Sequence, residues 1–548
     1  MRIMVDKKIM NMPNGTTAGE CLAAAGVPMA GVLAASRGTV IMELNDRIVA
    51  DATLAPITLL DEEGRRIYER SLRFVMLLAV RQLWPGQTVR IEYSVGHGVF
   101  VRLVDRVMDS AMVAQLKERM LDITAQNLPF EKKSWSLNEA MRYFTEDGQP
   151  DKVALLHYRP FPYFNMYCCG GMWEYFYGAM TPSTGYVSVF DLVMHGTGFV
   201  LQLPTEQDQA HAAPYVDRPR ILAAFAQSAK WCEILGVNNV ADLDRLVEER
   251  GLRDFIRVNE VLHDQAMTDI AREVLASGKR IVLIAGPSSS GKTTFAGRIA
   301  VHLRGMGRRS VRISLDDYYR PRRLLARDKS NAVDLESIDA LDVELFRDQI
   351  ARLLRGEEVE VPRYNFKTRK RERKGTLMQL EPDTIVIIEG IHGLNPMLAE
   401  GLPPQQIHRI FVSALTCLNL DNHNRIRTTD VRLLRRVVRD YLFRGTAPNQ
   451  TLDMWPSVRE GEEKWVFPYQ ETADSVFNTA LHYELPVLRH YAFHLLKQVS
   501  PDDSGYRLAI RLRKILNYIP DLDESVLEEI PPLSLLREFI GGCTIDEK

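Results

Sequence analysis

A glycine-rich segment has the residue types and spacing needed to bind phosphate groups. Residues 286–293 have the sequence Gly-Pro-Ser-Ser-Ser-Gly-Lys-Thr, which fits the pattern GxxxxGK[ST]. The apolar run before it predicts a strand and the segment after it predicts a helix, which is the context that this motif requires. Glycines let backbone N–H groups converge on phosphate oxygens at a helix N-terminus. The sequence therefore predicts a phosphate-binding loop (P-loop) for a nucleoside triphosphate.

The side chains of this loop have separate expected roles. Lys292 brings a positive charge to the β and γ phosphates, and the Thr293 hydroxyl is placed to ligate Mg²⁺. ATP and Mg²⁺ are therefore the expected cofactors. A glycine-rich turn that binds no ligand is the alternative. The residues expected to contact the nucleotide are Gly286, Ser288, Ser289, Ser290, Gly291, Lys292, Thr293 and Thr294.

Two carboxylates end predicted strands near this loop. Asp316 follows the run at 310–315, where it is placed to accept a proton from an attacking hydroxyl. Glu389 ends the apolar run at 384–389, a usual place for a second Mg²⁺ contact. The alternatives are a helix N-cap for Asp316 and an ordinary exposed strand end for Glu389.

A predicted helix within residues 425–444 carries several arginines. Helical spacing places Arg432, Arg435 or Arg436, and Arg439 along one side. Guanidinium groups suit bidentate phosphate contacts, so this row of arginines is a candidate lid over the transferring phosphoryl group. Taken alone, the row is also typical of a solvated helix face.

The elements that position these residues repeat as strand, glycine turn and helix. Short β-branched runs lie at 280–286, 310–315, 384–389 and 409–413. Continuous apolar runs of this kind suit strands of a parallel sheet that is buried on both faces. This alternation predicts a doubly wound α/β domain with a parallel sheet and a ligand at the carboxyl ends of its strands.

Length and composition limit the remaining classes of protein. A chain of 548 residues is long enough for about three or four domains. Its 69 basic and 71 acidic residues give a net charge of −2, which argues against non-specific binding of nucleic acid. No apolar run approaches the ~20 residues that cross a bilayer, and the six cysteines form no disulfide or zinc pattern. We therefore expect a cytoplasmic protein without a membrane segment.

Six segments resemble the uridine kinase / phosphoribulokinase family of P-loop kinases. The resemblance implies transfer of the γ-phosphate of ATP to the 5′-hydroxyl of a nucleoside, with uridine or cytidine as the expected acceptor. The segments are GPSSSGKTTF (286–295), SLDDYY (314–319), ESIDALD (336–342), VPRYNF (361–366), IIEGIHGLN (387–395) and TDVRLLRRVVRD (429–440).

The resemblance also implies roles for single residues. Asp316 takes the place of the catalytic carboxylate, and Asp339 that of a carboxylate holding the ribose hydroxyls. Tyr319 and Tyr364 fall on base-facing positions. Lys292 of the P-loop and the lid residues Arg432 and Arg436 are the other expected catalytic residues. Arg439 is expected to contact the base or a phosphate of the substrate.

Two departures from that family leave the acceptor open. Arg369 stands where uridine–cytidine kinases have a pyrimidine-contacting histidine, and Ile338 replaces a base-packing aromatic residue. A pentose phosphate or a pantothenate-like alcohol is therefore an alternative acceptor. A nucleotide-gated RNA-binding regulator is an alternative of a different class.

The front part of the chain resembles threonyl-tRNA synthetases. Residues 1–63 are similar to their ubiquitin-like TGS domain, a β-grasp fold, and residues 64–215 to the α+β editing domain that follows it. At the places of that site's HxxxH, Cys and His this chain has Arg70, Phe74, Phe176 and Met180, so we expect hydrolytic editing to be lost. RNA is an open but not an expected partner of these domains.

The predicted organisation is therefore multidomain α/β. The sequence leaves open whether the chain forms oligomers. The predicted parts are a TGS-like domain at 1–63, an editing-like domain at 64–215, a helical connector at 216–278, a P-loop kinase domain at 279–500 and a helical tail at 501–548.

Overall fold

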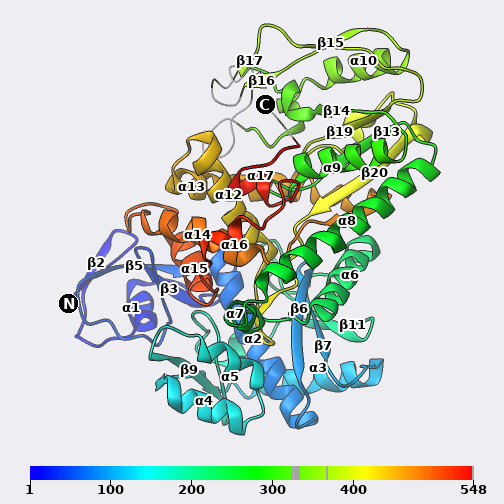
Figure 1. Cartoon of the computed structure of the whole chain (residues 1–548). Helices are drawn as coiled ribbons and strands as arrows, with labels where there is room; N and C mark the ends of the chain where they lie inside the picture. The colour runs from blue at the N-terminus through cyan, green and yellow to red at the C-terminus, as the bar shows by residue number, and fades with distance from the viewer. Residues whose placement is uncertain (322–324, 326–333, 366–367, 369, 546–548) are drawn as a thin grey trace. The chain divides into compact units, whose positions relative to one another are not determined.

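The computed structural model of the chain (Figure 1) describes residues 1–545 except 322–324, 326–333, 366–367 and 369. The chain forms two compact units. Unit 1 comprises Met1–Asp217, Asn239–Ala241 and Asn419–Arg425, and unit 2 comprises Arg218–Asn238, Asp242–Leu418 and Ile426–Lys548. Among the described residues, none of the helices is both long enough and apolar enough to cross a membrane.

Unit 1 begins with a small mixed sheet and one helix. The elements are β1 (Arg2–Val5), β2 (Lys8–Asn11), α1 (Ala18–Ala25), β3 (Ala34–Arg37), β4 (Val40–Met42) and β5 (Ala52–Ile57). The strand order is β2-β1-β5-β3-β4, and β1 runs parallel to β5 and antiparallel to β2. Asp6 and Lys7 both have positive φ, as a two-residue hairpin turn requires. α1 starts at Thr17, which forms a capping box with Glu20.

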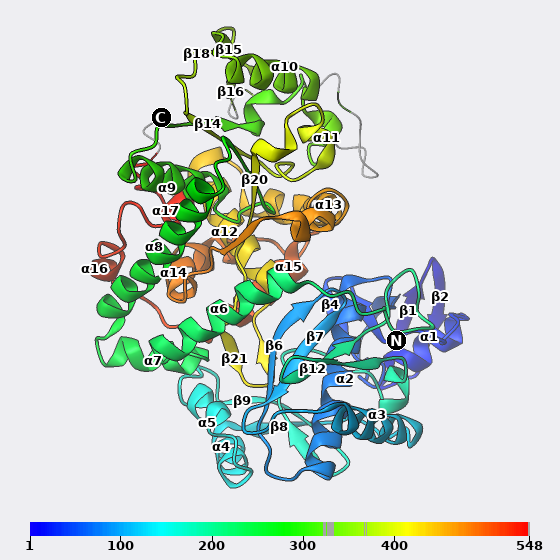
Figure 2. The same ribbon diagram turned by 90° about the vertical axis from the view of Figure 1, so that its right-hand side faces the viewer.

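The rest of unit 1 surrounds the long helix α2, which is buried along most of its length. A sheet in the order β11-β12-β7-β6, part of which is visible in Figure 2, shares its core. A second sheet has the order β10-β9-β8. The bounds are α2 (Glu62–Leu83), β6 (Val89–Val95), β7 (Gly98–Leu103), α3 (Ser110–Ala125), β8 (Glu131–Ser136), α4 (Leu137–Glu146), α5 (Pro150–His157), β9 (Tyr163–Cys169), β10 (Met172–Glu174), β11 (Asp191–His195) and β12 (Gly198–Gln202).

A hairpin from far along the chain completes unit 1. It consists of β21 (Asn419–Asp421) and β22 (Asn424–Arg425). The buried Lys152 ammonium lies 2.9 Å from Asp421 and 3.0 Å from Glu174, and His423 lies 2.8 Å from Glu174. These buried ionic contacts hold the hairpin, because removing one partner would leave an uncompensated charge in the core.

Unit 2 is built on a five-stranded parallel sheet in the order β14-β19-β13-β20-β23. Its strands are β13 (Ile281–Ala285), β14 (Ser310–Ser314), β19 (Ile385–Glu389), β20 (Ile407–Ser413) and β23 (Ser475–Asn478). The first four match the strands predicted from the β-branched runs. Strand β23 was not predicted from the sequence.

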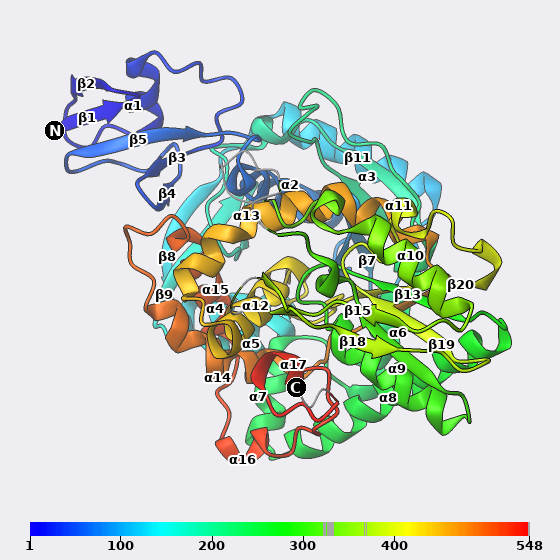
Figure 3. The same cartoon turned by 90° about the horizontal axis from the view of Figure 1, so that it is seen from above.

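Alternate side chains of β13 enter two different cores. Val282 and Ile284 pack in a core with helices α8 and α9, whereas Ile281 and Leu283 pack in a core with α10. Helices therefore cover both faces of the sheet (Figure 3), which confirms the predicted doubly wound α/β arrangement. The described helices of unit 2 with eight or more residues are α6 (Pro219–Leu235), α8 (Leu252–Ala276), α9 (Lys292–Gly305), α10 (Val343–Leu354), α12 (Thr428–Arg444), α13 (Pro448–Trp465), α14 (Glu484–Lys497) and α15 (Tyr506–Leu516). Helix α7 (Val240–Glu248) begins in the unit 1 segment Asn239–Ala241 and continues in unit 2.

Short elements complete unit 2. Two small antiparallel pairs lie between α10 and β19. The elements are β15 (Val359–Val361), β16 (Tyr364–Asn365), β17 (Lys370–Arg371), β18 (Thr376–Met378), α11 (Pro396–Ala399), α16 (Glu524–Leu527) and α17 (Arg537–Ile540).

Candidate active site

The P-loop lies between β13 and α9, and its backbone requires glycine. A Cβ atom on Gly286 would overlap the carbonyl oxygen of Val412. Gly291 has φ +87° immediately before α9, a conformation that side chains other than glycine rarely adopt. These constraints curl the loop around the N-terminus of α9, where the first backbone N–H groups have no partner within the helix.

Two hydroxyls of the loop are suited to a phosphate ligand. Ser289 and Ser290 are buried, and within the described part of the chain their Oγ atoms have no hydrogen-bond partner. Buried hydroxyls are normally paired, so orphaned hydroxyls at a helix N-terminus fit a triphosphate that accepts hydrogen bonds there.

Lys292 lies at the start of α9. Its ammonium donates a 3.1 Å hydrogen bond to the carbonyl oxygen of Pro287. Burial lowers its pKa, and the negative charges of Glu389 and Asp316 act in the opposite direction. This partly buried ammonium beside acidic groups is suited to a ligand that carries negative charge.

The two predicted Mg²⁺ ligands lie together. The Thr293 hydroxyl donates to Glu389 Oε1 at 3.4 Å, and the Ser314 hydroxyl donates to the same oxygen at 2.8 Å. Burial and the nearby charge of Asp316 together raise the pKa of Glu389 to about 7. Glu389 is buried rather than an exposed strand end. Hydroxyl and carboxylate oxygens are the hard ligands that Mg²⁺ prefers, so this donor set fits the ion.

Asp316 lies next to the predicted acceptor residues. It is in a short 3₁₀ turn, Leu315–Tyr318, whose N-cap position is Ser314, so Asp316 is not the cap. Burial raises the pKa of Tyr319, and the Asp316 charge adds to this effect. The rings of Tyr319 and Tyr364 are 5.7 Å apart. The predicted base-facing tyrosines therefore lie together near the predicted catalytic carboxylate.

The other residues predicted to bind the acceptor are not grouped with the tyrosine pair by any described contact. Asp339 is exposed, and its carboxylate accepts a 3.3 Å hydrogen bond from the Ser337 hydroxyl. Arg369 lies outside the described residues. Glu336 was not predicted to be a site residue, although it is the first residue of the matching segment 336–342. Burial raises its pKa to about 7, and the charges of Arg436, Glu462, Lys292 and Asp316 also act on it.

The arginines of α12 separate into two groups. Arg432 Nε donates to the carbonyl oxygen of Ser288 at 2.9 Å, and Arg436 Nη1 donates to the Ser288 hydroxyl at 2.6 Å. Arg435 is fully buried and pairs with Glu484 at 2.6 Å. Helical spacing therefore grouped residues that have different partners. Because Arg432, Arg435 and Arg436 are buried, the solvated-face alternative is wrong.

Arg439 follows on the same helix. It donates to Asp440 at 2.9 Å, and Asp440 also lies 3.4 Å from Arg436 and 3.7 Å from Arg444. Three guanidinium groups thus share one buried carboxylate. The proximity of Arg439, followed by burial, lowers the pKa of Arg444 to about 10.

Two glutamates from distant segments also contact the P-loop. Glu462 on α13 accepts a 2.9 Å hydrogen bond from the Ser288 backbone N–H, and Glu538 on α17 accepts a 3.1 Å hydrogen bond from the Thr294 N–H. Neither contact was predicted from the sequence. Neither glutamate lies in a recognisable motif, and both contacts depend on tertiary structure.

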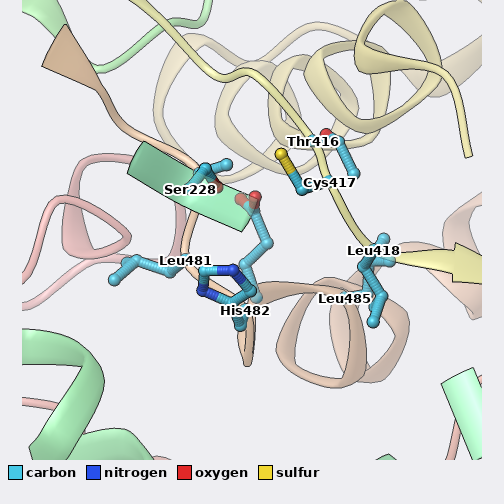
Figure 4. Close-up of a pocket in the computed structure, with 9 residues that line it drawn as sticks. Ser228, Thr416, Cys417, Leu418, Leu481, His482 and Leu485 are labelled. Atoms are coloured by element: carbon cyan, nitrogen blue, oxygen red, sulfur yellow. The ribbon is translucent and has the colours of Figure 1, made fainter. Parts of the chain in front are cut away.

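A small cavity lies beyond the ends of β20 and β23 (Figure 4). Its volume is about 10 Å³, which is room for about one water molecule, so it is too small for a nucleoside. His482 on its wall binds Asn259 through Nδ1 and Cys232 through Nε2, each at 3.1 Å. Burial lowers the pKa of His482 to about 4, so the ring is neutral at pH 7.

The four positions matched to the editing site lie close together in unit 1. The rings of Phe74 and Phe176 are 5.8 Å apart, and Met180 is buried beside Ser71. Arg70 is buried and donates to the carbonyl oxygen of Ala179. Aromatic and thioether side chains have no group for acid–base or nucleophilic catalysis.

The fold and the site of unit 2 define a P-loop phosphotransferase domain. The model of the phosphoribulokinase / uridine kinase family matches residues 281–484. A uridine kinase of Halobacterium salinarum is 30% identical over 200 residues, which are 35% of this chain and 77% of that protein. The chain therefore belongs to the phosphoribulokinase / uridine kinase family, and it is a small-molecule kinase.

Two further similarities extend the comparison. The chain is 27% identical over 191 residues to a threonine–tRNA ligase of Symbiobacterium thermophilum, which are 34% of this chain and only 29% of the ligase. This match lies in the N-terminal region, as the sequence predicted. The structure of a possible uridine kinase from Bacillus stearothermophilus has 20% identity and a TM-score of 0.27, and the match covers 39% of this chain and 98% of that one.

Proposed function

We propose that the chain is an ATP- and Mg²⁺-dependent kinase that phosphorylates the 5′-hydroxyl of a nucleoside, with uridine or cytidine as the expected acceptor. The observation that carries the proposal is the position of Asp316. Its charge acts on the pKa of both Lys292 of the P-loop and Tyr319, whose ring lies 5.7 Å from that of Tyr364. A general base between a phosphate donor and an aromatic pair suits transfer to an alcohol that carries a planar base.

In the proposed reaction Asp316 accepts the proton of the acceptor hydroxyl. The oxygen forms a bond to the γ-phosphorus, the bond between that phosphorus and the β–γ bridging oxygen breaks, and ADP leaves. Lys292, Arg432 and Arg436 stabilise negative charge on the phosphate oxygens. Thr293 and Glu389 would hold Mg²⁺, which when bound neutralises charge on the β and γ phosphates.

A second acceptor class is favoured by the arginines near Asp440. Arg436, Arg439 and Arg444 all lie close to the Asp440 carboxylate, so three guanidinium groups gather at this end of α12. The Arg444 pKa is also affected by the charge of Asp316. An anionic alcohol such as a pentose phosphate or pantothenate would bind to these guanidinium groups near the proposed base.

For the front half we infer a TGS-like domain at 1–63 and an editing-like domain at 64–215 without hydrolytic activity. The match to a threonine–tRNA ligase and the mixed sheet around α1 support the first part. The packing of Phe74, Phe176 and Met180 supports the second.

A screen of acceptors tests the proposed function. ADP release is measured with Mg²⁺-ATP and each common nucleoside, pentose phosphates or pantothenate, against a blank without acceptor. The proposal expects release above the blank with uridine or cytidine. Release only with the anionic alcohols would favour the second class. ATP-dependent retention of RNA without release on any acceptor would favour a regulator instead.

A further inference from the structure

The Glu462 carboxylate is hydrogen-bonded to a backbone N–H group of the P-loop. Its Oε1 accepts the hydrogen bond from Ser288 N–H, and it is also paired with Arg432, while Oε2 lies 2.9 Å from Arg459. Glu462 is fully buried. A charge-assisted hydrogen bond to a carboxylate is about twice as strong as a neutral one. A phosphate that binds this N–H group must therefore first break a strong hydrogen bond to Glu462.

Glu538 is hydrogen-bonded to a second backbone N–H group, that of Thr294. Thr294 is the third residue of α9, so its N–H is one of those that have no partner within the helix. The Glu538 carboxylate accepts this N–H from α17, near the C-terminal end of the described chain. The Glu538 charge also acts on the pKa of both Lys292 and Glu389. Glu538 therefore lies among the residues expected to bind the triphosphate.

We propose that Glu462 and Glu538 are internal competitors of the donor's phosphates, which the triphosphate must displace from the P-loop when it binds. This inference rests on the proposed binding of ATP at this loop. A single N–H group cannot donate fully to a carboxylate and a phosphate, and two anions at one site repel each other. The displacement makes α13 and α17 a built-in gate on donor binding, and it frees Arg432 to bind phosphate oxygens instead of Glu462.

Nucleotide affinity tests this gate with charge-neutral variants. Glu462→Gln and Glu538→Gln each remove one competing charge, so each should bind ATP about tenfold more tightly than the wild type, in the range of one charged hydrogen bond. Glu462→Asp keeps the charge and should stay closer to the wild type. The measurement is titration calorimetry of the full chain with Mg²⁺-ATP and no acceptor.

Matched controls separate this effect from a general change of charge. Glu463→Gln alters the next residue of α13, whose side chain is 65% exposed, and Glu529→Gln alters a residue paired with Arg257. Both controls should bind ATP within twofold of the wild type. Equal affinity in all variants, or weaker binding by Glu462→Gln and Glu538→Gln, would overturn the gate and leave the proposed function standing. No binding of ATP by the wild type would overturn both.

Hydrogen exchange of the wild type gives a test that does not depend on the folding of any variant. Saturating ATP should increase the exchange of backbone amides in 448–465 and 537–540, because their contacts to the P-loop are released. Exchange that stays unchanged in both segments, or that slows in both, would contradict the displacement even if ATP binds tightly.

Discussion

Ser314 and Glu389 are register partners in the adjacent parallel strands β14 and β19, and the Ser314 hydroxyl donates a 2.8 Å hydrogen bond to the Glu389 carboxylate. Both residues lie at the carboxyl ends of their strands. Thr293 adds a second hydroxyl to the same carboxylate oxygen. Two strands and one helix thus fix the orientation of a buried carboxylate, which is the requirement for a metal ligand that must not reorient during phosphoryl transfer.

Replacing Ser314 with alanine should weaken Mg²⁺ binding without disturbing the nucleotide loop. Loss of a hydrogen bond to a ligating carboxylate typically costs 10- to 100-fold in metal affinity, so the Mg²⁺ concentration for half-maximal rate should rise about tenfold. The measurement is the rate of ADP release against Mg²⁺ concentration. Ser310→Ala, at the other end of β14, should leave that concentration unchanged. Equal Mg²⁺ dependence in both variants would contradict the metal site.

Replacing Asp316 with asparagine should remove the proposed general base. Turnover should fall by about 100- to 10,000-fold, the usual contribution of general-base catalysis. The affinity for ATP should stay nearly the same, because the residue is proposed to contact the acceptor hydroxyl and not the donor. Turnover and ATP affinity are measured in parallel on the same preparation. Normal turnover would show that another group accepts the proton.

Replacing Gly286 with alanine should distort the P-loop, because the added Cβ would overlap the Val412 carbonyl oxygen. We expect ATP affinity to fall more than 100-fold (about 3 kcal/mol), which calorimetry detects directly. Gly305→Ala is the control, since a Cβ there meets no atom within 4 Å and alanine is the better helix former. Normal ATP affinity in the Gly286 variant would contradict the described loop.

The chain should lose stability in mild acid through a buried histidine. Burial lowers the pKa of His482 from 6.5 to about 4, so between these values the unfolded state binds more protons than the folded state. Stability therefore falls as the pH drops from 6.5 to 4, by about 2 kcal/mol at pH 5. Calorimetric melting of the chain at pH 7.5 and pH 5 measures the loss. His482→Gln should melt with a smaller difference between the two pH values, and an unchanged difference would refute this origin.

The P-loop and four strands of the parallel sheet could be predicted because short stretches of sequence determine their backbone geometry. The glycines and Lys292 of the P-loop follow from fixed spacing, and the strands of the parallel sheet follow from continuous apolar runs. The predicted proximity of Thr293 and Glu389 also follows, because parallel strands end at one edge of a sheet.

Features set by tertiary contacts did not follow from the sequence. Helical spacing grouped Arg435 with Arg432, but Arg435 pairs with Glu484 of α14. Glu462 and Glu538 reach the P-loop from segments 174 and 244 residues distant from their partners, so no local pattern indicates them. The hairpin 419–425 lies between β20 and α12 in sequence but belongs to unit 1.

The most direct measurement of the central proposal is acceptor-dependent ADP release by the full chain with Mg²⁺-ATP. We predict release that requires both Mg²⁺ and a nucleoside, yields the 5′-phosphorylated nucleoside in equal amount, and disappears on replacing Lys292 with alanine. Release no greater than the blank with every nucleoside, under conditions where ATP is bound, would contradict the account.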